Sequence, residues 1–137
     1  MNKHPLREIS EDEIRTFEDE GIVCVRGVLD NEWIARMQHA VDDILDPPTK
    51  FGQNLNNTGE AGRYAFDNNM WMFHDDFKAF VYDSPMAETA AKLLHSQMFN
   101  LIFDFLLVKE PHTPTPTTWH QGMPGNPVEG NACGMWI

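Results

Sequence analysis

Histidine is the residue type in this chain best suited to metal binding or acid–base chemistry, because imidazole is the commonest metal ligand in proteins and titrates near neutral pH. The six histidines are His4, His39, His74, His95, His112 and His120. His120 follows a proline- and threonine-rich approach and precedes a loop rich in glycine and proline, where side chains can point into a cavity. Two interpretations of His120 therefore stay open: a metal ligand, or an imidazole hydrogen-bonded to backbone in an irregular loop.

The other histidines are interpreted as structural or solvent-exposed residues. His39 and His95 fall on predicted helices and are interpreted as having no carboxylate or second histidine at a chelating spacing. His74 is followed by two aspartates, a ligand-like pattern, but its position favours a short helical turn that packs its phenylalanines inward.

Composition favours a single folded domain over residues 1–137 and argues against several classes of partner. Ten basic and 21 acidic residues give a net charge of −11, which would repel nucleic acid or an anionic membrane surface. Hydrophobic residues make up 42% of the chain, too many for a disordered acidic tail. The two cysteines are far apart and the N-terminus lacks the apolar core of a signal peptide, so we expect a cytoplasmic protein.

In the first half of the chain, local signals predict two helices and a short strand. Ser10 followed by Glu13 forms a capping box that starts a helix over residues 11–20, and the β-branched residues 22–25 predict a buried strand. Asp30 caps a second helix that Pro47 ends. Residues 49–69 are interpreted as a long surface loop with a short strand near residues 63–66.

In the second half, Ser84 followed by proline predicts a helix that continues to about His95. Residues 99–108 are the most apolar segment, which predicts a central strand buried on both faces. Residues 133–137 are a further strand candidate.

The order of these pieces resembles the phytanoyl-CoA dioxygenase family across residues 17–137. The resemblance is carried by five segments: residues 17–29, the Ser-Pro-Met-Ala at 84–87, the Phe-Asp at 103–104, the Val-Lys-Glu-Pro at 108–111, and the Thr-Thr-Trp-His-Gln at 117–121. It implies an α+β fold in which N-terminal helices buttress a partial double-stranded β-helix, the cupin-like jelly roll. It also implies an Fe(II)- and 2-oxoglutarate-dependent dioxygenase that hydroxylates a small molecule.

In that family two histidines and one carboxylate hold the iron, and His120 matches the first histidine. The residue at the carboxylate position is Gly122, and the family's second histidine and oxoglutarate-binding arginine would come after Ile137. We therefore expect one incomplete domain that lacks the C-terminal strands, inactive as this chain and able to associate with itself through exposed strand edges.

Three further residues are cofactor-binding candidates by the same resemblance: Arg63, Ile102 and Trp136. A solvated arginine, a core isoleucine and a barrel-filling tryptophan are the competing interpretations. Two alternative functions stay open beside the oxygenase. One is a non-catalytic binding module on the same scaffold, and the other is a nonhaem iron halogenase, in which chloride takes the place that Gly122 leaves free.

Overall fold

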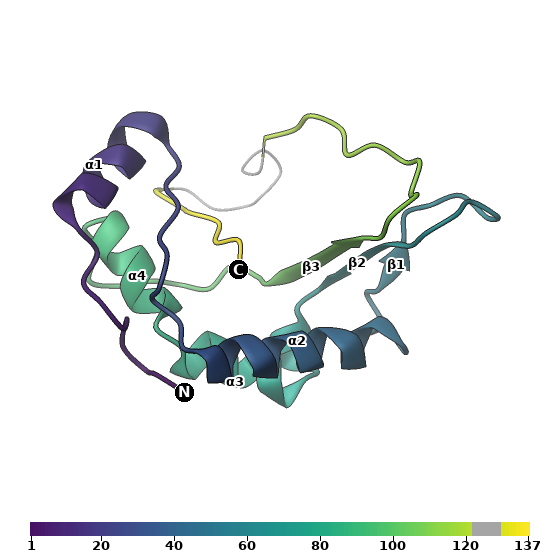
Figure 1. Ribbon diagram of the computed structural model, residues 1–137, viewed down its shortest axis with the longest axis horizontal. Coiled ribbons are helices and arrows are strands. Elements are labelled where there is room, and N and C mark those ends of the chain that lie inside the picture. The colour runs from purple at the N-terminus through teal and green to yellow at the C-terminus, as the bar shows by residue number, and fades with distance from the viewer. Residues whose placement is uncertain (122–129) are drawn as a thin grey trace.

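The computed structural model describes residues 1–121 and 130–137 and shows a small α+β fold (Figure 1). Within these residues, four α-helices and a short 3-10 helix accompany three strands. In chain order the elements are α1 (Glu11–Glu20), α2 (Asn31–Leu45), β1 (Gln53–Asn54), β2 (Tyr64–Asn68), η1 (Met70–Met72), α3 (Asp75–Asp83), α4 (Met86–Leu93) and β3 (Phe105–Lys109).

The three strands form one antiparallel sheet in the order β1-β2-β3. Helices α2 and α3 contact each other and lie on one side of the sheet, while the chain that follows β3 arcs along the other side (Figure 1). The core lies between α2 and the sheet, where Ala40 and Ile44 pack with Met70 and Phe77, and Leu106 of β3 packs against them.

The first two helices confirm the sequence prediction because their end signals are local. The Ser10 side chain accepts a hydrogen bond from the backbone N–H of Glu13, the Glu13 carboxylate accepts one from the backbone N–H of Ser10, and Gly21 closes α1 in the left-handed conformation at φ 73°. Asp30 caps α2 by accepting a hydrogen bond from the Trp33 N–H at 2.8 Å, and the helix ends before Pro47.

The predicted helical turn after His74 is the full helix α3. His74 itself is the N-cap, and its ring accepts a hydrogen bond from the Asp76 N–H at 3.2 Å. Phe77 and Phe80 are buried as predicted, and the Phe80 ring meets Trp33 of α2 edge to face at 5.2 Å. Helix α4 follows Ser84 and Pro85 but ends at Leu93, slightly before the predicted His95.

The strand predicted over residues 22–25 is wrong: the segment is an irregular connection between α1 and α2. Ile22 is 74% exposed and Cys24 is also exposed. A β-branched run becomes a strand only where a neighbouring strand accepts its backbone hydrogen bonds, and the described residues place none beside it.

Two further strand predictions also need correction. Within the predicted residues 99–108 the strand β3 begins only at Phe105; it continues to Lys109 and lies at the edge of the sheet rather than buried on both faces. The pairing stops at Asp104, because β2 ends at Asn68 and the chain turns there into η1. Residues 133–137 are irregular as well, with Trp136 88% exposed.

The α+β class is confirmed, and the sheet of the described residues has three strands. In the part of the chain that the structure describes, no helix combines the length and apolar character needed to cross a bilayer.

Candidate functional site

The segment that carries His120 is tied to the sheet at two points. The Thr113 hydroxyl donates a hydrogen bond to the Arg63 carbonyl at 3.2 Å, and the hydroxyls of Thr117 and Tyr64 lie 2.8 Å apart. Tyr64 is buried and begins β2. Side chains alternate along a strand, so Tyr64 lies on the face of the sheet opposite Ala65 and Asp67. The histidine segment therefore lies over the face of the sheet that α2 leaves open.

His120 presents one ring nitrogen for ligation. Its Nδ1 lies 2.9 Å from the carbonyl oxygen of Thr118, and the side chain is exposed. A carbonyl only accepts, so Nδ1 donates its hydrogen and the neutral ring keeps a lone pair on Nε2. This hydrogen bond is the kind that fixes the tautomer of a metal-binding histidine.

The described residues do not complete an iron site around that nitrogen. Within residues 1–121 and 130–137, no three side chains of His, Cys, Asp or Glu lie close enough together to hold a metal ion. Gly122, the residue at the family's carboxylate position, lies outside the described residues. The described donor set therefore does not fit a facial triad of two histidines and one carboxylate.

The Arg63 side chain contacts Glu110 and the end of α2, not His120. Its guanidinium donates to the Glu110 carboxylate from Nε at 3.0 Å and from Nη2 at 2.7 Å, and Nη1 donates to the Leu45 carbonyl at 3.3 Å. Arg63 therefore joins the end of α2 to the end of β3, on the side of the sheet that faces the helices. A role in cofactor binding stays a prediction, and in this structure it would compete with the ion pair to Glu110.

The other two cofactor candidates lie in irregular segments. Ile102 is 44% exposed in the stretch before β3, and Trp136 projects near the C-terminal end of the chain. No described hydrogen bond or ion pair links either residue, or Arg63, to His120. Their assignment to a cofactor pocket rests on the family resemblance alone.

The centre of the open face of the sheet is apolar. Alternation along the strands places Phe66 of β2 beside Leu107 of β3 and, farther along, Phe105 on this face. Phe105 is 49% exposed, and its ring lies 5.9 Å from that of Phe103. Such a face suits the apolar part of a small molecule.

A charged cluster that the sequence interpretation missed lies on the helical side of the sheet. Asp43 of α2 faces two imidazoles, with its Oδ2 3.6 Å from His39 Nε2 and 3.7 Å from His74 Nε2. The spacing of four residues between His39 and Asp43 on one helix could have revealed the first pair. The contact with His74 depends on how α2 and α3 pack, which no local pattern shows.

The geometry thus defines an α+β domain with helices on one face of an antiparallel sheet. On the other face lies a segment whose His120 imidazole has one nitrogen free to bind a metal. A family model described as phytanoyl-CoA dioxygenase (PhyH) matches residues 17–137. The chain therefore belongs to the phytanoyl-CoA dioxygenase family, whose members are oxygenases that generally use Fe(II) and 2-oxoglutarate. No curated protein and no solved structure matches the chain.

Proposed function

We propose that this chain is part of the machinery of a 2-oxoglutarate-dependent oxygenase that hydroxylates a small molecule, and that its three-stranded sheet belongs to a jelly roll. The observation that carries the proposal is the tie between Tyr64 and Thr117, which holds the family's histidine segment over the open apolar face of the sheet. The family match over residues 17–137 supplies the reaction class.

The chain's own residues would bind the substrate and orient His120. The apolar face around Phe66 and Leu107 would hold the body of the substrate, since burying apolar surface is the main source of affinity for such a ligand. Tyr64 is a positioning residue, because it acts on His120 through Thr117. His120 would contribute one nitrogen ligand through Nε2.

We further propose that the chain by itself holds iron weakly. One imidazole cannot retain ferrous iron against water and competing ligands, and Gly122 supplies no side-chain oxygen. The same substitution favours a second candidate function, a non-catalytic module that binds small molecules on the same face. A halogenase would also have a glycine at this position, and chloride-dependent spectra would distinguish it.

The test is an anaerobic titration of the purified chain with ferrous iron, with and without 2-oxoglutarate, followed by visible absorption and calorimetry. The Gly122→Asp variant restores the His-x-Asp pair of the family. We expect it to bind iron at least about 10-fold more tightly than the unaltered chain, as the gain of a ligand should.

Two controls separate the iron site from unspecific binding. Adding His120→Ala to Gly122→Asp should abolish the gain. His112→Asn, which removes an exposed imidazole at a position with φ 68° that asparagine tolerates, should leave it unchanged. An equal affinity of Gly122→Asp and the unaltered chain would leave the non-catalytic module as the better account.

A further inference from the structure

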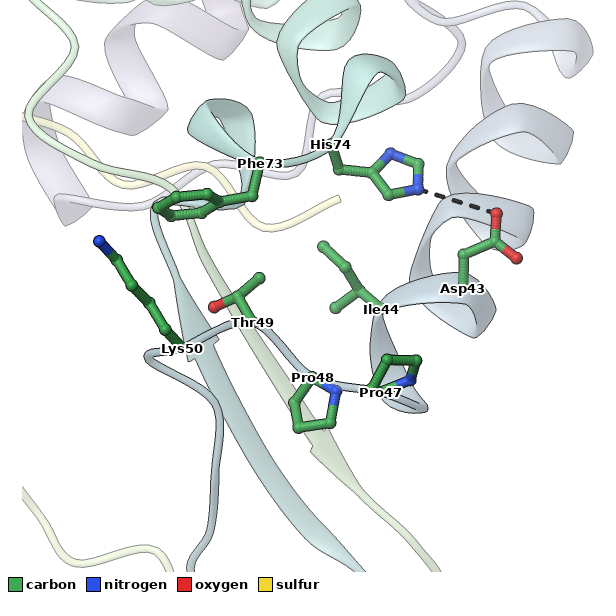
Figure 2. Close-up of a pocket in the computed structure, with 8 residues that line it drawn as sticks. All are labelled: Asp43, Ile44, Pro47, Pro48, Thr49, Lys50, Phe73 and His74. Atoms are coloured by element: carbon green, nitrogen blue, oxygen red, sulfur yellow. Dashed lines mark ion pairs between the residues drawn. The ribbon is translucent and has the colours of Figure 1, made fainter.

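We propose that the hollow between the C-terminal end of α2 and the start of α3 binds a small hydroxylated carboxylate with an apolar body. The hollow has a volume of about 360 Å³, near the lower end of the range for small-molecule pockets. Its lining includes two opposed charged ends and an apolar middle (Figure 2). This site is separate from the proposed oxygenase site.

Lys50 forms the cationic end of the pocket. Its ammonium lies 5.0 Å from the ring centre of Phe51 and 5.2 Å from that of Phe73, so two aromatic faces hold the charge in place. No carboxylate among the described residues forms an ion pair with Lys50. In a chain with a net charge of −11, this end of the pocket offers a cation to an anionic ligand.

Asp43 and His74 form the opposite end of the pocket (Figure 2). His74 accepts the Asp76 N–H on Nδ1, so the hydrogen of its neutral ring lies on Nε2, which faces Asp43 Oδ2 at 3.7 Å. That separation is too long for a direct hydrogen bond. A ligand hydroxyl can accept from His74 Nε2 and donate to Asp43, which satisfies both groups.

The middle of the pocket is apolar. Ile44, Thr49 and Phe73 lie between the two charged ends, and the Thr49 hydroxyl is already hydrogen-bonded to Asp67 (Figure 2). An aromatic or aliphatic ligand body would bury against these side chains, while its two polar ends reach Lys50 and Asp43.

Hydrogen bonds and close packing hold the loop that carries Lys50 against β2. The buried carboxylate of Asp67 accepts hydrogen bonds from the Thr49 N–H at 2.8 Å and from the Thr49 hydroxyl at 2.5 Å. A methyl group at Gly52 would lie only 2.3 Å from the Cβ of Pro48, so the loop packs closely on itself. A preformed pocket wall loses little conformational entropy on binding.

The pocket lies across the sheet from His120. Asp67 anchors the loop on the face of β2 that points toward the helices, whereas Tyr64 anchors the histidine segment on the opposite face. Binding in this pocket can therefore be measured independently of iron.

The experiment is a titration of the isotopically labelled chain with 3-(4-hydroxyphenyl)propanoate, followed by amide NMR shifts. We expect saturable shifts at Lys50 and His74. Lys50→Met should weaken binding about 5-fold, as for loss of one partly exposed charge pair, and Lys78→Met on α3 should not change it. Tyramine, which carries an ammonium in place of the carboxylate, should bind more weakly than the acid.

Two further variants keep the test decisive. Lys50→Glu should reverse the preference so that tyramine binds better than the acid, and Asp43→Asn should reduce the advantage of the hydroxylated acid over 3-phenylpropanoate. Equal binding of acid and amine, or an unchanged affinity in Lys50→Met, would overturn the proposal. The iron affinity of Gly122→Asp should be the same with and without Lys50→Met, which separates failure of this pocket from failure of the oxygenase proposal.

Discussion

Asp67 is the residue whose replacement tests the packing of this fold most sharply. The residue is 3% exposed, and its two carboxylate oxygens accept hydrogen bonds from the Thr49 N–H, the Thr49 hydroxyl and the Asn68 N–H. The Asp67→Asn substitution keeps the shape of the side chain but exchanges one acceptor oxygen for an NH₂ group. Whichever way the amide turns, one backbone N–H then faces a donor.

The expected loss of stability in Asp67→Asn follows from that one contact between two donors. A buried donor left without an acceptor costs about 1–3 kcal/mol, and the remaining bonds lose their charge. We therefore expect Asp67→Asn to lower the free energy of unfolding by about 2 kcal/mol and the midpoint temperature by roughly 6–10 °C.

The assay is urea and thermal unfolding followed by far-ultraviolet circular dichroism. Asp42→Asn on the exposed surface of α2 is the matched control, because it makes the same chemical change without a buried acceptor. If the two variants unfold at the same urea concentration, the hydrogen bonds of Asp67 do not anchor the loop, and the reasoning is refuted.

Three other substitutions should change stability in defined directions. The Arg7 guanidinium lowers the pKa of Glu13 to about 2, so this carboxylate stabilises the fold above pH 4.5 and loses its effect as the pH falls toward 2; Glu13→Gln should cost about 1 kcal/mol at pH 7 in urea unfolding. Burial raises the pKa of Asp104 above 3.8, which favours the protonated folded state, so stability falls as the pH rises through the raised pKa. Asp104→Asn should therefore stabilise the protein at pH 7, by about 1 kcal/mol, and lose that advantage near pH 3. Gly52→Ala should lower the free energy of unfolding by about 1–3 kcal/mol through its clash with Pro48, measured by thermal unfolding.

Each of these three predictions has its own check. Glu11→Gln alters a first-turn carboxylate that makes no hydrogen bond or ion pair among the described residues, and it should cost less than Glu13→Gln at pH 7. A less stable Asp104→Asn at pH 7 would show that the carboxylate is a favourable acceptor there. Gly134→Ala, where an added methyl meets no atom within 4 Å, should be close to neutral, and Gly52→Ala should not match it.

The helices were predictable because their signals lie within a few residues of each end. The capping box at Ser10 and Glu13 and the cap at Asp30 act through hydrogen bonds made inside one turn of helix. Pro47 ends α2 because proline has no backbone N–H to continue the helix. Such signals hold whatever the rest of the chain does, and the structure places helix ends at or near these residues.

The strands were less predictable because a strand depends on its neighbour. The β-branched run at 22–25 has the right residue types but no partner among the described residues, while β2 forms because β3 pairs with it residue by residue. The apolar residues before Asp104 likewise predicted a longer strand. They do not form one, because β2 is long enough to pair only with Phe105–Lys109.

The candidate site was likewise predictable only in part from the sequence. His120 was recognisable from its surrounding motif, and its tie to the sheet through Tyr64 and Thr117 was not, since these hydroxyls are far apart in the sequence. The pocket between Lys50 and Asp43 was also invisible, because it forms where the loop after α2 meets the start of α3.

The central claim is that His120 is the residue with which this member of the phytanoyl-CoA dioxygenase family would bind iron. The most direct measurement is the anaerobic ferrous titration with 2-oxoglutarate of three proteins: the unaltered chain, Gly122→Asp, and Gly122→Asp with His120→Ala. We predict weak binding by the first, a saturable oxoglutarate-dependent absorption band in the second, and its loss in the third. A band of equal strength in all three, or in none, would contradict the claim.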